Sequence, residues 1–325
     1  MKATAVAPSN IAFIKYWGRK DDTLRLPENG SISMNLSNLL TTTTVEFSKD
    51  FKKDSVIIDN QEEQNEQKRV IKHLDRIRKL AKINYKAKVV SKNNFPTSTG
   101  LSSSASGFAA LTVAATKAAG LNLSEKELSI LARQGSGSAC RSIPDGFVEW
   151  LDGDRNETSY AVSIFPPNYW DIVDIVAIVS DDKKAVPTSE GQKLAASSPF
   201  FEVRLSHIKD KIEKIKKSIR ERNFVKFGEL VEAEALELHA IMLTSNPSLL
   251  YWLPGTVEMM RFIRKLRQDG LPVYFTVNTG QDIHLIAQEQ NSQVLIKKLK
   301  ELDIVKEIIK NKSSEGTRLV EGGLF

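Results

Sequence analysis

The stretch FPTSTGLSSSASGFAAL, residues 95–111, gathers glycine and hydroxyl side chains immediately before an apolar, alanine-rich run. That run predicts a helix over residues 108–119, which stops at Gly120. A helix N-terminus presents unpaired N–H groups and partial positive charge, and Gly100 lets the backbone turn tightly ahead of it. The stretch therefore predicts a phosphate-binding loop. A serine-rich loop that precedes a helix without binding any ligand is the alternative.

Serine hydroxyls accompany these main-chain donors, since Ser102, Ser103 and Ser104 follow one another in the loop. Such hydroxyls can also reach Mg²⁺. The loop lacks the Gly-Lys-Ser/Thr sequence of a Walker P-loop, so it is not a phosphate loop of that type.

Two further stretches carry groups that bind anions. RQGSGSACRSIPDGFVEW, residues 133–150, has two Gly-Ser pairs followed by Arg141, although a turn leading into a strand needs no ligand. Residues 7–36 place donors on and after an apolar strand, where Lys15 could equally be an edge lysine and Trp17 a core aromatic. The polar side chains of this segment are Asn10, Lys15, Tyr16, Arg19, Ser31 and Ser33. Several anion sites in one chain favour phosphate binding over coincidence.

Composition excludes several classes of protein. The 46 Lys and Arg residues exceed the 40 Asp and Glu residues only mildly and alternate with them, which favours a solvated surface over a nucleic-acid platform or another polyanionic partner. Cys140 is the sole cysteine, so an intrachain disulfide and a thiolate zinc site are impossible. The apolar N-terminus is broken by polar residues and proline, and no later run could span a bilayer, which predicts a cytoplasmic protein without a membrane segment.

Hydrophobic patterning predicts mixed helices and strands in two lobes, residues 1–170 and 171–325. Strands are expected at residues 41–47, 55–59, 86–91 and 170–180, with two more in 271–288 joined by a turn. Helices are expected at residues 70–80, 108–119, 124–133, 205–219, 223–243 and 257–268, and Ser124 with Glu127 forms a capping box. No linker separates the lobes, so we expect them to be interdependent.

The stretches NIAFIKYWGRKD, FPTSTGLSSSASGFAAL and GSGSACRS…GFVEW stand in the order and spacing of the diphosphomevalonate decarboxylases of the GHMP kinase superfamily, and the chain resembles that family over essentially its whole length. The resemblance implies a two-lobed α+β GHMP kinase fold. Its N-terminal lobe would be like domain 2 of ribosomal protein S5, with a left-handed βαβ crossover, and its C-terminal lobe ferredoxin-like. It also implies ATP, Mg²⁺, a phosphorylated mevalonate as the substrate and a homodimer.

The reaction that the resemblance implies begins with transfer of the γ-phosphate of ATP to the C3 hydroxyl of 5-diphosphomevalonate. Phosphorylation turns a tertiary hydroxyl into a good leaving group, so phosphate and CO₂ then depart and leave isopentenyl diphosphate. Three alternatives stay open. The substrate is the 5-monophosphate and the product isopentenyl phosphate, the protein is a mevalonate 3-kinase without decarboxylation, or it is a non-catalytic scaffold that binds a ligand.

The resemblance also implies roles for individual residues. The catalytic residues would be Asn278, Arg141 and Lys15. The nucleotide would be bound by Pro96, Gly100, Leu101, Ser102, Ser103, Ser104, Ala105 and Ser106, with the metal at Ser104. The substrate would be bound by Lys15, Tyr16, Trp17, Arg19, Ser136, Gly137, Ser138, Arg141, Lys184 and Ser189, with Trp17 as a wall of the site.

The chain departs from the family pattern in the turn that normally reads Asp-Ala-Gly-Pro-Asn, because residues 278–282 read NTGQD. The amide of Asn278 cannot accept a proton at neutral pH, although its oxygen can orient a hydroxyl. Phosphoryl transfer asks mainly for positioning and charge neutralisation, so activity is not excluded. Either orientation suffices, or an acid such as Asp282 or Asp21 takes over, or the site is impaired.

Smaller departures concern the substrate phosphates. Arg19 stands where the family commonly has lysine, and this keeps the charge but changes the geometry. Ala195 and Ala196 occupy a stretch where some bacterial relatives have an arginine for the terminal phosphate, which favours the monophosphate alternative. His284 lies near the turn and could reach the substrate, although a structural role is the more common one for an isolated histidine.

Overall fold

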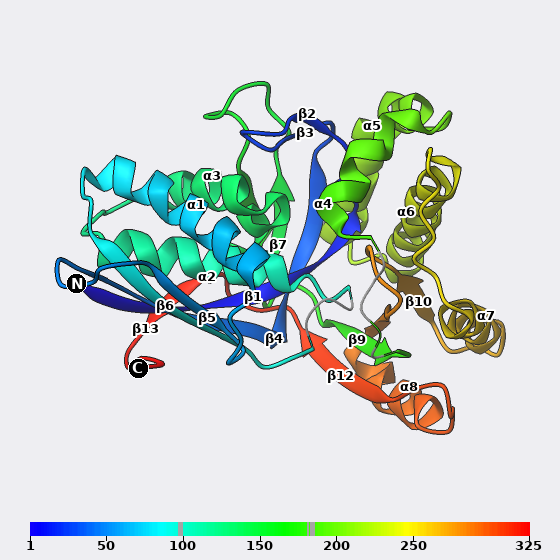
Figure 1. Ribbon diagram of the computed structural model, residues 1–325. Helices are drawn as coiled ribbons and strands as arrows, with labels where there is room; N and C mark the ends of the chain where they lie inside the picture. Colours follow the sequence, from blue (N-terminus) through cyan, green and yellow to red (C-terminus); the bar gives the residue numbers. More distant parts are fainter. Residues whose placement is uncertain (97–99, 181, 183–185) are drawn as a thin grey trace.

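The computed structural model describes residues 1–96, 100–180, 182 and 186–325. Lys184, one of the predicted substrate contacts, lies outside the described residues. The chain forms two lobes, each built on one large sheet, and the two termini lie at the same end of the first lobe (Figure 1).

The first lobe packs a seven-stranded sheet against helices on one face (Figure 1). Its central path runs β13-β1-β4-β6-β5, with β7 paired to β4 and β8 to β7. The strands are β1 (Lys2–Ile14), β4 (Ser31–Ser48), β5 (Ser55–Ile58), β6 (Lys86–Asn93), β7 (Phe147–Trp150), β8 (Ala161–Phe165) and β13 (Arg318–Val320). The helices are α1 (Gln64–Ala81), α2 (Ser103–Ala118), α3 (Glu125–Gly135) and the 3₁₀ turn η1 (Gly137–Ser142), and a small hairpin pairs β2 (Arg19–Asp21) with β3 (Leu26–Pro27).

The second lobe is a four-stranded antiparallel sheet in the order β10-β11-β9-β12, which is the strand order of a ferredoxin-like fold. Its strands are β9 (Ile172–Ile178), β10 (Val273–Thr276), β11 (Ile283–Gln288) and β12 (Glu307–Lys312). The helical elements are α4 (Thr188–Gly191), η2 (Gln192–Ser197), α5 (Phe201–Arg220), α6 (Phe224–Thr244), α7 (Pro254–Gln268), η3 (Glu289–Asn291) and α8 (Ser292–Leu299). The predicted α+β class and the predicted elements are confirmed.

The predicted start of the alanine-rich helix is wrong, because α2 begins at Ser103 and not at Phe108. The serines that the composition assigned to a loop therefore form the first turn of the helix, while Ser102 in the left-handed conformation (φ 60°) precedes it. The parallel pairing of β5 and β6 around α1 forms the expected crossover, whose hand stays a prediction. Within the described part of the chain, every helix is too short or too polar to cross a membrane.

A shared apolar core joins the lobes. Phe13 of β1 makes an edge-on contact with Phe227 of α6, with ring centroids 4.9 Å apart, and Trp170 packs edge-on against Phe227 at 5.2 Å. The same cluster continues through buried residues of β4, β9 and α5. Because one core includes side chains from both sheets, the relative position of the lobes is set by close packing.

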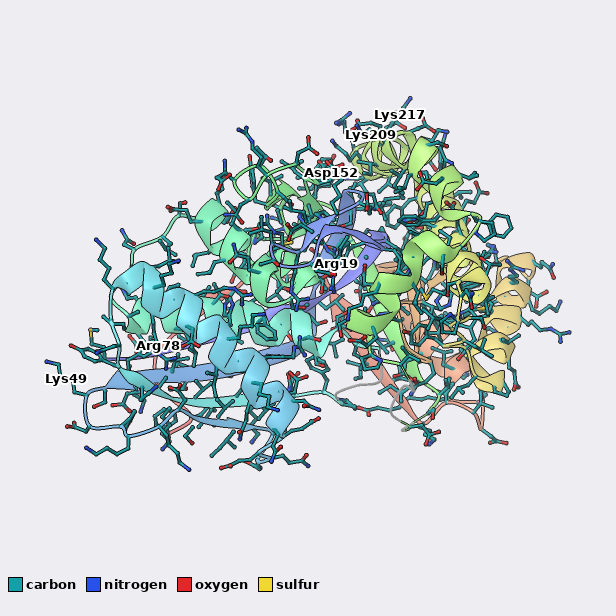
Figure 2. The ribbon with its side chains drawn as sticks, turned by 45° about the horizontal axis from the view of Figure 1, so that its top comes forward. Arg19, Lys49, Arg78, Asp152, Lys209 and Lys217 are labelled. Carbon is teal, nitrogen blue, oxygen red and sulfur yellow. The ribbon has the colours of Figure 1, made fainter. Side chains whose placement is uncertain are left out.

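Charged side chains surround both lobes. Lys49, Lys209 and Lys217 point outward, whereas Arg19 lies in the middle of the molecule, between the lobes (Figure 2). The mild excess of positive charge therefore includes groups at the interior as well as at the solvated surface.

Removal of one helix cap should measurably destabilise the first lobe. The Ser124 hydroxyl accepts a hydrogen bond from Glu127 N, and the Glu127 carboxylate accepts from Ser124 N at 2.8 Å. Ser124→Ala should lower the free energy of unfolding by about 1 kcal/mol, measured by urea denaturation. Ser206→Ala, at an exposed position inside α5, is the control and should change it by less than about 0.5 kcal/mol. Equal effects of the two variants would contradict the capping assignment.

Candidate active site

One cavity of about 510 Å³ lies where the lobes meet, a volume suited to a small ligand. Its walls come from the end of β1, from β4 and β6, from the segment that leads from β5 into α1, and from the start of α2, η1, α4 and the turn after β10. Of the predicted site residues, the cavity is lined by Lys15, Tyr16, Arg19, Gly100, Ser102, Ser103, Ser104, Ser136, Gly137, Ser138, Arg141, Ser189 and Asn278. The fold thus brings together most of the stretches that the sequence singled out, from both lobes.

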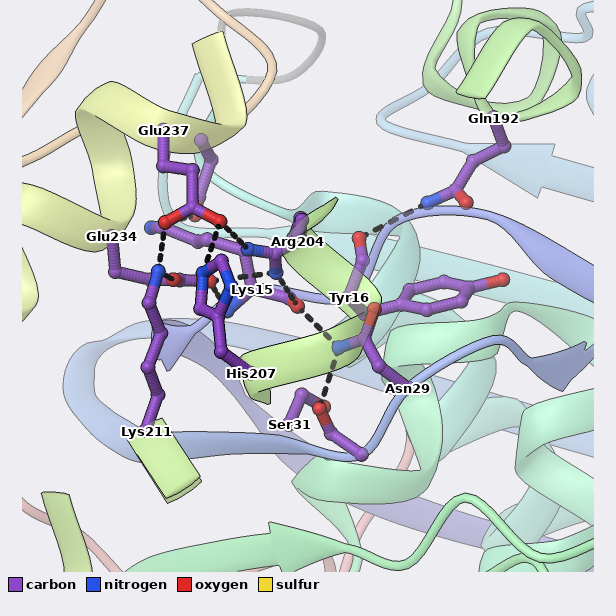
Figure 3. A network of polar contacts seen from close by, with 12 residues as sticks. Lys15, Tyr16, Asn29, Ser31, Gln192, Arg204, His207, Lys211, Glu234 and Glu237 are labelled. Atoms are coloured by element: carbon purple, nitrogen blue, oxygen red, sulfur yellow. Dashed lines mark hydrogen bonds and ion pairs between the residues drawn. The ribbon is translucent and has the colours of Figure 1, made fainter. Parts of the chain in front are cut away.

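Lys15 is held on both sides of its backbone by a buried ion pair (Figure 3). Its amide N–H donates to Glu234 Oε1 at 3.0 Å, and its carbonyl accepts from Arg204 Nη2 at 2.8 Å. Arg204 and Glu234 pair with each other at 2.6 Å, and neither side chain is exposed. Asn29 Nδ2 adds a third hydrogen bond, to the Lys15 carbonyl, at 2.9 Å. The residue that directly follows β1 is therefore fixed by α5 and α6 of the second lobe.

The Glu234 carboxylate stays charged despite its burial. Burial alone raises the pKa of Glu234, but the Arg204 and Lys211 charges outweigh that effect and the net pKa is lowered. Lys211 Nζ lies 2.9 Å from Glu234 Oε2, so each carboxylate oxygen has a cationic partner. The negative charge of Glu234 beside Lys15 is consequently balanced by Arg204 and Lys211.

The Lys15 ammonium contacts an amide and not a carboxylate. Its Nζ donates to Asn278 Oδ1 at 2.9 Å, and the side chain is only 2% exposed. Burial lowers the pKa of Lys15 to about 7; the Glu234 charge opposes this shift and the Arg141 charge adds to it. At neutral pH a substantial fraction of this amine is therefore uncharged.

Asn278 is positioned by contacts with both lobes. His239 Nε2 lies 3.0 Å from the Asn278 carbonyl oxygen, and burial lowers the pKa of His239 to about 3, so its neutral Nε2–H donates that bond. The side-chain Nδ2 of Asn278 lies 3.5 Å from Ser102 Oγ at the mouth of α2. Oδ1 of Asn278 is thereby left to face Lys15.

Arg141 is a buried cation without a carboxylate partner among the residues that the structure describes. Its Nη2 and Nε donate to Asn10 Oδ1 at 3.0 and 3.3 Å, and Nη1 donates to Ser31 Oγ at 2.8 Å. It is 4% exposed, and burial lowers its pKa. A guanidinium that is held only by neutral acceptors and lines a cavity is suited to bind an anion.

A second cationic group lies at the β2–β3 hairpin. Arg19 Nε donates to Tyr16 Oη at 2.9 Å, and Arg25, which also lines the cavity, donates from Nε to Gln134 O at 3.2 Å. Burial, together with the Arg19 charge, lowers the pKa of Arg25 to about 10.

Tyr16, which accepts the Arg19 hydrogen bond, packs over Gly137, where an added Cβ would lie 2.7 Å from the Tyr16 ring. The hairpin thus contributes positive charge to the same cavity.

The N-terminus of α2 faces the turn of the second lobe. Gly100 has φ 114°, and a Cβ there would lie 2.9 Å from Gly280 Cα, so no larger residue fits between loop and turn. The first turn of α2 carries no acidic side chain, and Ser104 is exposed to the cavity. Uncompensated N–H groups and serine hydroxyls fit a nucleotide phosphate with its Mg²⁺. Elsewhere in the described chain no cluster of His, Cys, Asp or Glu side chains could itself hold a metal ion.

Some predicted site residues lie away from the cavity surface. Trp17 is 1% exposed and packs among Phe201, Leu238 and other apolar side chains of the second lobe, so it supports the cavity from behind instead of forming its wall. This corrects the predicted role of Trp17. Four members of the predicted nucleotide loop are also absent from the lining: Pro96, Leu101, Ala105 and Ser106. Leu101, Ala105 and Ser106 are buried because alternate faces of the loop and helix turn inward.

The acids proposed to replace the family carboxylate do not line the cavity. Asp282 Oδ1 accepts from Val179 N at 3.2 Å, and Asp21 Oδ1 accepts from Leu24 N at 2.6 Å. His284 lies 3.0 Å from both carboxylate oxygens of Asp174 inside the second sheet, which gives it a structural role. These placements leave Lys15 and Asn278 at the centre of the site.

Sequence reasoning missed several residues of the site. Arg204, Glu234 and His239 lie on helices whose polar positions look like a solvated face, so no local signal marks them. Arg25 lies in a short turn with several charged residues, and nothing in the sequence separates it from these neighbours. Only its place in the cavity lining marks it as a site residue. Gln192 lines the cavity and contacts the segment after β1, accepting from Gly18 N at 2.7 Å.

The fold and the cavity lined by cationic side chains define a protein of the GHMP kinase class. Residues 7–161 match the family model described as "Diphosphomevalonate decarboxylase-like N-terminal domain", and residues 174–320 match "Mevalonate 5-diphosphate decarboxylase C-terminal domain". The chain belongs to the diphosphomevalonate decarboxylase family.

Individual relatives agree with that assignment. The diphosphomevalonate decarboxylase of Candida albicans is 36% identical over 312 residues, covering 90% of this chain and 86% of the relative. The phosphomevalonate decarboxylase of Haloferax volcanii is 34% identical over 293 residues, covering 90% of each. A solved structure described as "MDDEF in complex with MVAPP, AMPPCP and Magnesium" is 35% identical with a TM-score of 0.94, covering 99% of both chains.

Breaking the buried ion pair should destabilise the protein strongly. Glu234→Ala leaves the buried Arg204 with only the more distant Glu237, at 3.7 Å, as an anionic partner, so the free energy of unfolding should fall by about 3–5 kcal/mol in urea denaturation. Glu221→Ala removes an exposed partner of Lys217 at 3.8 Å and should cost less than about 1 kcal/mol. A small effect of Glu234→Ala would show that α5 and α6 hold β1 by other contacts.

Proposed function

We propose that this protein catalyses the ATP-dependent decarboxylation of 5-diphosphomevalonate to isopentenyl diphosphate. The observation that carries the proposal is a buried Arg141, held by neutral acceptors, in the same cavity as Lys15 and the N-terminus of α2. Such a cavity has positively charged groups at two places, so it can bind two anionic reactants next to each other. The related structure with MVAPP, AMPPCP and magnesium, and the decarboxylase relatives, support this pairing of substrates.

In this proposal the two ends of the cavity have different tasks. The main-chain N–H groups at the start of α2, with Ser102 and Ser103, bind the nucleotide phosphates, and the Ser104 hydroxyl contributes to the Mg²⁺ shell. Mg²⁺ would neutralise charge on the phosphates as the transferred group moves. Gly100 allows the close approach of the second-lobe turn, which keeps water away from the reacting groups.

The substrate would lie between η1 and β1. Arg141 binds the carboxylate or a C5 phosphate, and Lys15 and Asn278 face the C3 hydroxyl. Tyr16, Arg19, Ser136, Ser138 and Ser189 surround the remaining phosphate oxygens. A carboxylate held by a guanidinium would stay in place while the C3–oxygen bond breaks and its electron pair leaves with the phosphate. The bond between C2 and the carboxylate carbon then breaks, CO₂ departs, and that electron pair forms the double bond between C2 and C3.

The same proposal includes a division at residue 170 between the lobes, a homodimer and a cytoplasmic location. The two matched segments of the family models leave residues 162–173 between them, which supports a boundary there. A single cysteine, Cys140, which is buried, is compatible with a reducing compartment.

Decarboxylation of the 5-monophosphate is a second candidate with its own support. Ala195 is 2% exposed and packs in the core, and Lys193 of η2 pairs with Glu190 outside the cavity lining. Among the described residues, η2 therefore offers no cation to a terminal phosphate. The relative from Haloferax volcanii is a phosphomevalonate decarboxylase. Arg19 and Arg25 are the groups through which a diphosphate would gain affinity.

A direct assay separates these candidates. The purified protein with ATP and Mg²⁺ should release ADP and CO₂ in equal amounts from 5-diphosphomevalonate, and more slowly from the 5-phosphate or from mevalonate. A faster reaction of the 5-phosphate would favour the second candidate. ADP without CO₂ would indicate a 3-kinase, and the absence of both would indicate a non-catalytic scaffold.

Arg141→Lys should lower kcat/KM for the phosphorylated mevalonate about 10- to 100-fold, because lysine keeps the charge but loses the planar set of donors. Steady-state kinetics at saturating ATP measures the change. Arg155→Lys, at an exposed loop position, is the matched control and should stay within about twofold of the parent. Equal values for both variants would remove Arg141 from the substrate site.

A further inference from the structure

Phosphorylation of a hydroxyl releases a proton, and a side chain of the cavity that is close to the hydroxyl can accept it. The titratable side chains lining it, within the described residues, are Lys15, Tyr16, Arg19, Arg25, Asp59, Glu63, Glu66, Arg69 and Arg141. Arginine does not lose its proton under these conditions, and burial raises the pKa of Tyr16. Among the side chains of this lining, the possible proton acceptors are therefore the three carboxylates and the amine of Lys15.

Asp59 and Glu63 belong to the connection between β5 and α1, and Glu66 lies in the first turn of α1. Asp59 accepts hydrogen bonds from Asn93 N and Nδ2, both at 2.8 Å. Glu66 pairs with Arg69 at 2.6 Å, and Glu63 is exposed ahead of α1. None of them contacts Asn278, whereas Lys15 does.

The Lys15–Asn278 contact leaves a proton-accepting position on the amine. Asn278 Oδ1 takes one hydrogen bond from Nζ but cannot take the proton itself. A neutral amine can still donate one N–H to Asn278 while its lone pair stays available. The backbone of Lys15 is fixed by Glu234, Arg204 and Asn29, so the amine is held at a defined place.

We propose that the neutral amine of Lys15 accepts the proton of the substrate hydroxyl, with Asn278 as the residue that positions it. This inference rests on the proposed function and deepens it. The proton passes from the C3 oxygen to the Nζ lone pair, and that oxygen forms a bond to the γ-phosphorus of ATP. The bond from the γ-phosphorus to the bridging oxygen breaks, and its electrons leave with ADP.

The surroundings of Lys15 favour the neutral amine near physiological pH. Its charged or titratable neighbours come from every element packed against it: Glu234 and His239 on α6, Arg204 on α5, Arg141 on η1 and Asp174 on β9. Burial is the largest cause of the lowered pKa of about 7, with Arg141 and Arg204 adding to it and Glu234 and Asp174 opposing it. Since the active form is deprotonated, activity should rise as the pH rises through about 7.

A carboxylate in place of the Asn278 amide would favour the charged form of the Lys15 amine instead of the neutral one. An aspartate at position 278 would form an ion pair with Lys15, raise the pKa of the amine and itself be able to accept the proton. The acid limb in the pH profile of the Asn278→Asp variant should therefore move to lower pH. An acid limb that stays near pH 7 in this variant would overturn the assignment of that limb to Lys15.

Lys15→Arg is the second test, because arginine preserves the positive charge and a donor toward Asn278 but cannot become a base. Turnover should fall about 10²- to 10⁴-fold and the acid limb near pH 7 should disappear. Binding of the phosphorylated mevalonate without nucleotide, measured by calorimetry, should weaken less than about 10-fold. Lys193→Arg, an exposed lysine paired with Glu190, is the control and should retain the parent profile.

A readout independent of activity comes from NMR titration of the lysine side chains in the ligand-free protein. The Lys15 signal, identified by its loss in Lys15→Arg, should have a midpoint near pH 7 and move up by at least about one pH unit in Asn278→Asp. ADP and CO₂ formation with a Lys15 midpoint above about 9 would overturn the proton-accepting role alone. Absence of ADP and CO₂ at every pH would overturn the proposed function, and this role with it.

Discussion

The buried ion pair between Arg204 and Glu234 is the interaction on which the site depends. It binds both the N–H and the C=O of Lys15, at the point where the first strand leaves the shared core. Two opposite charges in the interior thus satisfy backbone groups between the lobes, and Asn29 Nδ2 adds a further hydrogen bond to the carbonyl. The geometry of a first-lobe residue is thus set by two second-lobe helices, and the cavity exists only when the lobes are packed together.

The electrostatics of the cavity follow from how its cations are held. Arg141 is bound by amide and hydroxyl oxygens, and Lys15 contacts an amide oxygen, so neither charge is neutralised by a carboxylate within the described lining. Buried cations of this kind repel each other and lower one another's pKa, as Arg141 does to Lys15. An anionic ligand would relieve that repulsion, which supports the proposed binding of phosphorylated compounds in this cavity.

Local sequence patterns predicted which helices and strands exist better than they predicted the residues at which these begin and end. The capping box at Ser124 and the alternating strands follow from short-range chemistry, and the structure agrees with them. The start of α2 at Ser103 was missed because serine is common both in loops and in the first turn of a helix. The family resemblance placed Trp17 at the cavity wall, and the residues around it left a core position open, because an aromatic residue beside Lys15 and Tyr16 gives no indication of which face it presents.

The amino-acid sequence by itself determined the candidate phosphate-binding loop, the family resemblance and the presence of Asn278 where the family has a carboxylate, because these are matters of residue type and spacing. Only the tertiary structure decided that the amine of Lys15 lies beside the Asn278 amide and that Glu234 is the negative charge near this amine. Glu234 and His239 come from a helix whose polar residues look alike in one dimension, and only the packing of α6 against the first strand buries some of them. Burial and proximity set a pKa, and both arise only when distant segments meet.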